Sequence, residues 1–248
     1  MAKWFWRAHQ RAAVITLGAS GDEFSAPTRI QTNFLARGER NLLNWLCRRT
    51  PSWVTPDHYT AIGFLGASLA TVGYALSNWR LGFLLLAAFG IFLNWVGDSL
   101  DGSLARFRRI ERPQYGYFLD HSFDVINISM IFIGLAMSPY VRSDVALFAL
   151  VGCLLITVHV LLVNHVEGRF HLGFVGLGPT ELRLVLIGFA FDMYFIGPKY
   201  ISAFGVRLTN DTVFTGILGV IFCAMFAADF IQSERRLVKA DPRPEAWK

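Results

Sequence analysis

Charged residues are scarce in this sequence. Asp, Glu, Lys and Arg together make up 17% of the 248 residues, whereas hydrophobic residues make up 54% and aromatic residues 15%. Soluble globular domains carry about 25% charged residues. The shortage of charge therefore excludes an ordinary soluble domain, and the composition favours a single domain embedded in a membrane.

Cysteine is also scarce, and several common metal-binding motifs are absent. The three cysteines, Cys47, Cys153 and Cys223, are far apart and form no Cys-x-x-Cys pair, which excludes a disulfide framework and a thiolate metal site. The DSLDG segment at 98–102 lacks the alternating ligands and the terminal Glu of an EF-hand. No Glu-x-x-His pair is present, which argues against a carboxylate-bridged di-iron centre.

Six long apolar windows dominate the sequence instead. A helix that crosses a membrane needs roughly 20 mainly apolar residues. Windows of that kind lie near residues 58–77, 81–105, 116–137, 144–166, 180–198 and 211–232. The sequence therefore predicts an all-α integral membrane protein with six transmembrane helices. The first window also carries a small-residue face that permits close helix packing, formed by Gly63, Gly66, Ala67, Ala70 and Gly73.

The segments outside these windows complete the predicted organisation. Residues 30–49 mix apolar side chains with arginines in the pattern of an amphipathic helix. We expect this helix to lie at the membrane interface, and a helix packed on the protein is the alternative. We thus predict a cytoplasmic or interfacial segment at 1–50, a membrane domain at 51–233 and a basic cytoplasmic tail at 234–248.

Lys and Arg are distributed unevenly between the two sides of the predicted membrane domain. With six spans, the side that holds both termini also holds about 18 of the 23 basic residues, and the other side holds only Arg80, Arg142, Lys199 and Arg207. The positive-inside rule makes the basic side cytoplasmic. The formal net charge of +5 then favours anionic lipid headgroups, and not nucleic acid, as partners of the basic surface.

Four aspartates interrupt the apolar pattern in the middle of the chain. Asp98 and Asp101 are three residues apart, and Asp120 and Asp124 are four apart, so on helices each pair projects from one face. Ionised carboxylates beside apolar runs are costly unless they are paired or bound to a metal. Two helices meeting there would form a four-carboxylate cluster, which favours Mg2+ or Mn2+. His121 would point about 100° away from Asp120 on a helix, and we do not expect it to be a ligand.

This stretch resembles the signature of the CDP-alcohol phosphotransferase family, D-x2-D-G-x2-A-R followed by G-x3-D-x3-D. All fixed positions are present, namely Asp98, Asp101, Gly102, Ala105, Arg106, Gly116, Asp120 and Asp124. Upstream, the TPDHYT segment at 55–60 resembles the T-P-N-x-x-T element at the start of the family's first span, with Asp57 where Asn is usual. The resemblance covers residues from about 53 to 233.

The resemblance implies a membrane enzyme of phospholipid synthesis and a role for each matching residue. In this family the hydroxyl of an acceptor attacks the phosphorus atom of a CDP-alcohol, and CMP is released. By correspondence, Asp98, Asp101 and Asp120 bind two metal ions, Mg2+ or Mn2+, while Asp124 helps to bind them and takes the proton of the acceptor. The positions that would contact the CDP part are Gly102, Ala105, Arg106, Gly116, Asp57 and Thr60.

The alcohols that are exchanged stay open at this stage. We expect CDP-diacylglycerol as the donor and a small polar acceptor such as glycerol phosphate, inositol, inositol phosphate or serine. The alternative within the family is CDP-choline or CDP-ethanolamine with diacylglycerol as the acceptor. A divalent-ion channel or transporter could also use intramembrane acids, but it gives no reason for the spacing of Gly102, Ala105 and Arg106. Glu181 and Arg183, at the start of the fifth window, are candidates for acceptor binding or for a simple helix start.

The resemblance also suggests the surroundings of the enzyme. Homodimers are common in families of this kind, and a second copy of the chain is a possible partner. We expect a multi-pass protein of a bacterial inner membrane whose aspartate cluster, at the ends of the second and third spans, opens toward the cytoplasm.

Overall fold

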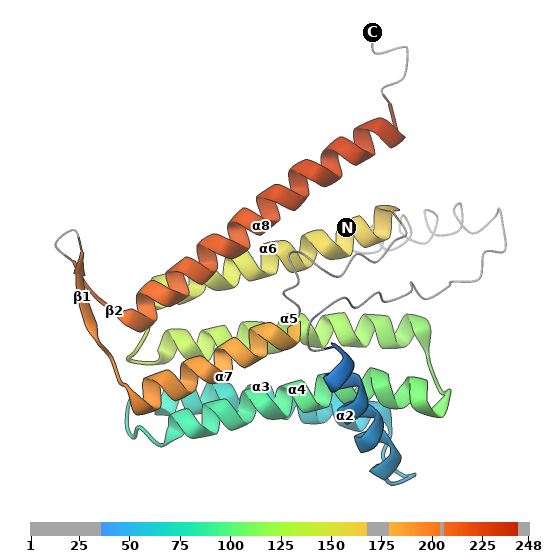
Figure 1. Cartoon of the computed structure of the whole chain (residues 1–248), viewed down its shortest axis with the longest axis horizontal. Coiled ribbons are helices and arrows are strands. Elements are labelled where there is room, and N and C mark those ends of the chain that lie inside the picture. The colour runs from blue at the N-terminus through green and yellow to red at the C-terminus, as the bar shows by residue number, and fades with distance from the viewer. Residues whose placement is uncertain (1–35, 168–178, 204–205, 243–248) are drawn as a thin grey trace, which may run out of the picture.

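The structure is a computed structural model that describes residues 36–167, 179–203 and 206–242. Within these ranges the chain is almost entirely helical (Figure 1). The helices are α2 (Ala36–Arg49), α3 (Pro56–Leu76), α4 (Phe83–Arg108), α5 (Pro113–Met137), α6 (Ser143–Glu167), α7 (Pro179–Phe195) and α8 (Asn210–Ala240). Two short antiparallel strands, β1 (Tyr200–Ala203) and β2 (Val206–Thr209), form a hairpin between α7 and α8.

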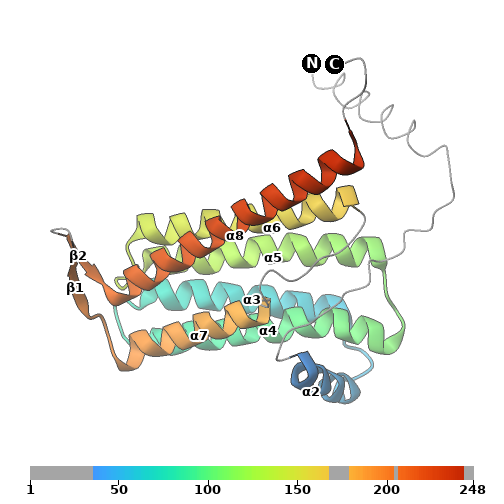
Figure 2. The same cartoon turned by 45° about the horizontal axis from the view of Figure 1, so that its top comes forward.

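The long helices lie side by side and pack in an order that differs from their order in the chain (Figures 1 and 2). Contacts run from α7 to α4, then to α3, α5, α6 and α8. The main core lies between these helices, and Tyr74, Leu84, Ile91 and Phe132 are fully buried in it. The loop from α4 to α5 lies at one end of the bundle and the hairpin at the other. The aspartates of α4 and α5 therefore gather at the end opposite the hairpin.

Five of the predicted spans are confirmed as helices long and apolar enough to cross a membrane. They are α3, α4, α5, α6 and α8, and the chain is thus a multi-pass integral membrane protein. The last of them differs most from its predicted window, because α8 continues to Ala240 instead of ending near residue 232. The segment at 234–240, predicted as the start of a tail, is helical because it contains good helix formers and no proline before Pro242.

The sixth predicted window, 180–198, coincides with α7, which has 17 residues and ends at Phe195. At 1.5 Å per residue such a helix is about 26 Å long, slightly less than the roughly 30 Å of a bilayer core. Gly197, with a φ of 70°, follows the end of the helix. The hairpin that comes next was not predicted, since strands of four residues are too short to show in a window chosen for membrane helices.

The predicted N-terminal helix is present from Ala36 to Arg49, while residues 30–35 of that prediction lie outside the described ranges. Leu43 and Cys47 of α2 pack against Leu100 and Leu104 of α4 in a second, smaller core. Burial raises the pKa of the Cys47 thiol, so the residue stays neutral and packs as a small apolar group. The other face of α2 is exposed, including Trp45. The helix therefore packs on the protein, and its place at a membrane surface stays a prediction.

The predicted small-residue face of α3 packs directly on α4. The backbones of the two helices approach so closely that Cβ atoms at Gly66 and Gly97 would overlap the backbone of the partner helix. Gly97 lies against Gly63 and immediately precedes Asp98. This contact fixes the separation of α3 and α4 at the level of the aspartates.

Replacing Gly97 with Ala is expected to push α3 away from α4 and to lower the free energy of unfolding by about 2 kcal/mol, as overpacking of a tight contact does. Thermal unfolding in detergent would measure the loss. Gly188→Ala on α7 is the matched control, because nothing lies within 4 Å of a Cβ atom at that position. Equal stability of the two variants would contradict the tight contact.

Candidate active site

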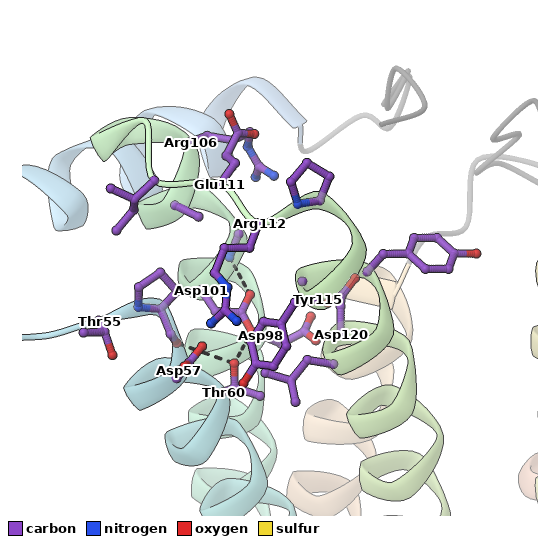
Figure 3. Close-up of a pocket in the computed structure, with 18 of the residues that line it drawn as sticks. Thr55, Asp57, Thr60, Asp98, Asp101, Arg106, Glu111, Arg112, Tyr115 and Asp120 are labelled. Carbon is purple, nitrogen blue, oxygen red and sulfur yellow. Dashed lines mark hydrogen bonds between the residues drawn. The ribbon is translucent and has the colours of Figure 1, made fainter. Parts of the chain in front are cut away.

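A cavity of about 450 Å³ opens at the end of the bundle where α4 turns into α5 (Figure 3). Its walls come from the start of α3, the end of α4, the connecting loop and the start of α5. Polar and charged side chains are prominent among the residues that line it, which include Thr55, Asp57, Thr60, Asp98, Asp101, Arg106, Glu111, Arg112, Tyr115 and Asp120. The cavity can therefore hold a ligand that carries both charge and hydrogen-bonding groups.

Asp101 joins α3 to α4 at the wall of this cavity. Its Oδ2 accepts a hydrogen bond of 2.8 Å from Oγ1 of Thr60, and its Oδ1 accepts one from the backbone N–H of Gly102. Thr60 is buried, so the bond holds the carboxylate in one orientation. Figure 3 shows Asp101 between Thr60 and the side of the cavity that carries Arg112.

Asp98 and Asp124 are joined by an arginine from a third helix. Nη1 of Arg183 donates to Oδ2 of Asp98 at 2.7 Å, and Nη2 donates to Oδ1 of Asp124 at 3.3 Å. Nε of Arg183 donates to Oδ1 of Asn94 at 3.0 Å, while Nδ2 of Asn94 donates to the carbonyl of Gly63 at 3.0 Å. Arg183 is buried. One guanidinium group thus holds α4, α5 and α7 together beneath the cavity.

A possible metal site lies on α5. Asp120, His121 and Asp124 each offer one ligand atom, and these atoms lie within 4.8 Å of one another. The His121 ring does not point away from Asp120 as expected: its Nδ1 lies 3.5 Å from Oδ2 of Asp120. Arg183 brings one positive charge to a group of four carboxylates, so this cluster retains negative charge that a divalent cation would offset. The donor set therefore fits a hard cation.

The structure brings together most of the residues predicted for the site. Those that line the same cavity are Asp57, Thr60, Asp98, Asp101, Gly102, Ala105, Arg106, Gly116 and Asp120. Asp124 is not among the residues that line it, and it reaches the cluster through Arg183 and Asp98. Glu181 and Arg183, the two candidates for acceptor binding, are both outside the set of residues that line the cavity, and Arg183 binds the carboxylates of Asp98 and Asp124.

Several residues that line the cavity were not predicted as site residues, and three of them carry charge or an aromatic ring beside the aspartates in the chain. Glu111, Arg112 and Tyr115 come from the α4–α5 loop and the first turn of α5. The guanidinium carbon of Arg112 lies 3.8 Å from the centre of the Tyr115 ring, which is a cation–π arrangement. Their position in the sequence could have indicated a role in the site. They lie between the two aspartate pairs, and the loop that joins the pairs must lie next to the aspartate cluster.

Sequence comparison decides the family. The family model described as CDP-alcohol phosphatidyltransferase matches residues 53–227, which is well over half of the chain. The chain belongs to the CDP-alcohol phosphatidyltransferase family. This match confirms the family expected from the aspartate signature and, with it, the expected enzyme class, a CDP-alcohol phosphotransferase.

Three proteins with established descriptions are similar to parts of the chain. The archaetidylinositol phosphate synthase of Methanothermobacter thermautotrophicus is 32% identical over 171 residues, which cover 67% of this chain and 81% of that protein. The archaetidylinositol phosphate synthase of Pyrococcus horikoshii is 36% identical over 104 residues, which are 42% of this chain. This match spans about half (52%) of the length of that protein. Inner membrane protein YnjF of Escherichia coli is 30% identical over 179 residues, 70% of this chain and 73% of that protein.

Proposed function

We propose that this protein transfers a phosphatidyl group from CDP-diacylglycerol to the hydroxyl group of a small polar acceptor. In this reaction the acceptor oxygen forms a bond to the phosphorus atom that carries the diacylglycerol, the bond from that phosphorus to the oxygen of CMP breaks, and CMP leaves. The observation that carries the proposal is the convergence of the signature residues of α4 and α5 on one cavity in a member of this family.

The acidic residues would divide the chemistry between them. Asp98, Asp101 and Asp120, together with Asp124, would hold two Mg2+ or Mn2+ ions, which when bound neutralise charge on the diphosphate and acidify the acceptor hydroxyl. A carboxylate oxygen of Asp124 would take the proton from that hydroxyl. Arg183 would keep Asp124 and Asp98 in place through its two bonds to them.

The CDP part would lie along the cavity wall. The three heavy atoms nearest to the position of a Cβ atom at Gly102 all belong to the end of the Arg106 side chain, so a movable side chain, and not backbone, covers this glycine on the side of a nucleotide. The guanidinium group of Arg106 offers the planar donors that suit a diphosphate. Asp57, Thr60, Ala105 and Gly116 complete this wall.

Among the acceptors, a phosphorylated inositol is the first to test. Two similar proteins are described as archaetidylinositol phosphate synthases, and their name supports an inositol phosphate product. Arg112 adds a second arginine beside Arg106 at the cavity, which would favour a phosphorylated acceptor or donor. Glu181 and Arg183 stay proposed as residues near the acceptor through their place on α7.

The proposed placement in the membrane follows from the same geometry. The basic ends of α2 and α4 would face the cytoplasm, so the cavity would open there. Helix α7 would act as a short sixth span beside α4, and the exposed face of α2 would contact anionic headgroups. We further propose a bacterial inner membrane and an assembly of two copies.

Release of CMP tests this function. Purified protein in detergent would be given CDP-diacylglycerol and Mg2+ or Mn2+, with inositol phosphate, glycerol phosphate, inositol and serine as separate acceptors. We expect release that depends on one acceptor and stops when the divalent cations are chelated. Release that persists in excess chelator would contradict the proposed cation requirement. Turnover only with CDP-choline or CDP-ethanolamine and diacylglycerol would replace the proposed donor with that alternative.

A further inference from the structure

Arg108, the last residue of α4, binds the loop between α2 and α3. Its Nη2 donates to the main-chain carbonyls of Thr50 at 3.0 Å and Pro51 at 2.8 Å. Its Nη1 donates to the carbonyls of Val54 and, at 3.4 Å, Ser52. One side chain thus satisfies four carbonyl groups of a single loop.

This arrangement differs from that of an ordinary basic residue at a membrane surface. Arg106 and Arg109, on either side in the sequence, are exposed, whereas Arg108 is half-buried. Between α2 and Pro56 the loop contains one turn, in which the Val54 N–H donates to the Pro51 carbonyl at 3.1 Å, and the carbonyl groups of Thr50, Ser52 and Val54 take a donor from Arg108. The planar fork of an arginine supplies several donors in fixed directions.

Arg108 is also the last of three residues on one face of α4 that contact earlier parts of the chain. Asp101, Leu104 and Arg108 follow a spacing of three and four residues, which places them on one face of the helix. Asp101 binds Thr60, Leu104 packs against α2, and Arg108 binds the loop between α2 and α3. One face of α4 therefore holds three parts of the chain that precede it.

The loop leads directly into the wall of the cavity. Thr55, Pro56 and Asp57 follow Val54 in the chain and line the cavity, as Gly102 of α4 does. A shift of the loop would carry this wall with it, because only Thr55 separates Val54 from the start of α3.

We propose that Arg108 is a positioning residue that holds the Thr55–Thr60 wall against α4 and thereby sets the affinity for the CDP part of the donor. The proposal rests on the proposed CDP-alcohol chemistry of this cavity. Arg108 acts on the substrate through the loop, so it should affect binding more than turnover. A positive charge alone should not hold the loop. The Arg108 guanidinium contacts four carbonyl groups through two nitrogen atoms, whereas a lysine has a single ammonium nitrogen and cannot contact all four.

Three variants separate geometry from charge. Arg108→Gln removes the charge and the fork, Arg108→Lys keeps the charge, and Arg109→Gln removes a charge from the exposed neighbour. We expect KM for CDP-diacylglycerol to rise roughly tenfold in both Arg108 variants, with kcat changed less than about threefold. Arg109→Gln should match the wild type. Wild-type KM in Arg108→Lys, or a fall in kcat without a rise in KM, would overturn the proposal.

A second readout does not require turnover. Arg48 and Arg49 are exposed at the end of α2 and adjoin the loop, so trypsin cleavage there reports how firmly the loop is held. We expect cleavage in detergent to be several times faster in both Arg108 variants than in Arg109→Gln, at equal thermal stability. Equal cleavage rates would overturn the proposal that Arg108 holds the loop. If the variants are cleaved faster but the wild type releases no CMP, only the proposed reaction is contradicted.

Discussion

Asp124→Asn is expected to reduce turnover by about 10²- to 10⁴-fold, the usual contribution of a general base. Asn has nearly the same shape, but its amide cannot take a proton from the acceptor hydroxyl. It keeps an oxygen in the position of Oδ1, which accepts the 3.3 Å bond from Arg183, so the helices should stay in place. CMP release would give kcat, and equilibrium binding of CDP-diacylglycerol should remain within a few-fold of the wild type.

Asp144→Asn is the matched control for this change. Asp144 is an exposed aspartate in the first turn of α6, a helix that begins at the hairpin end of the bundle (Figure 1), and it pairs with Arg142 at 2.7 Å. The pair is far from the cavity and should leave kcat unchanged. Turnover of Asp124→Asn within tenfold of the wild type would remove Asp124 from the role of base.

Arg183→Met is expected to lower the free energy of unfolding by about 3 kcal/mol, as removal of one partner from a buried charge pair does. Met fills a similar length but leaves Asp98 and Asp124 without their shared cation. Solvent screens this interaction little, since 10% of the Arg183 side chain is exposed, against 20% for Asp98 and 31% for Asp124. Thermal unfolding in detergent without divalent ions would measure the loss.

Two comparisons make this result specific. Mg2+ should raise the unfolding temperature of Arg183→Met more than that of the wild type, because a divalent cation binds and stabilises the uncompensated carboxylates. Arg207→Met, which removes an exposed arginine from β2, should have little effect under either condition. An Arg183→Met protein as stable as Arg207→Met would show that the buried pair does not stabilise the bundle.

Much of the architecture could be predicted from the sequence, because membrane helices are built from local runs of apolar residues. The windows near 81–105 and 144–166 appear as α4 and α6 with ends shifted by three residues or fewer. The small-residue face of α3 was equally visible, and the structure shows close packing there, against α4. These features depend on residues close together in the chain.

The remaining features depend on which helices become neighbours. Arg183 lies 85 residues from Asp98 in the chain, and only the packing of α7 on α4 brings the two together. From the sequence, Arg108 is only one of the basic residues on the predicted cytoplasmic side, because its loop partners cannot be inferred from its own helix. Residues 168–178, part of the glycine-rich segment before α7, lie outside the described ranges.

The position of α7 late in the chain has a consequence for biosynthesis. The ribosome completes α4 and α5, with all of the signature residues, before it reaches Arg183. Insertion of α4 and α5 can therefore begin before Arg183, the partner of Asp98 and Asp124, exists. During that interval, protonation, water or bound cations must lower the cost of the carboxylates. Insertion of α7 then completes the cluster, so a chain truncated after α6 would contain the whole signature and still lack the cation that joins Asp98 to Asp124.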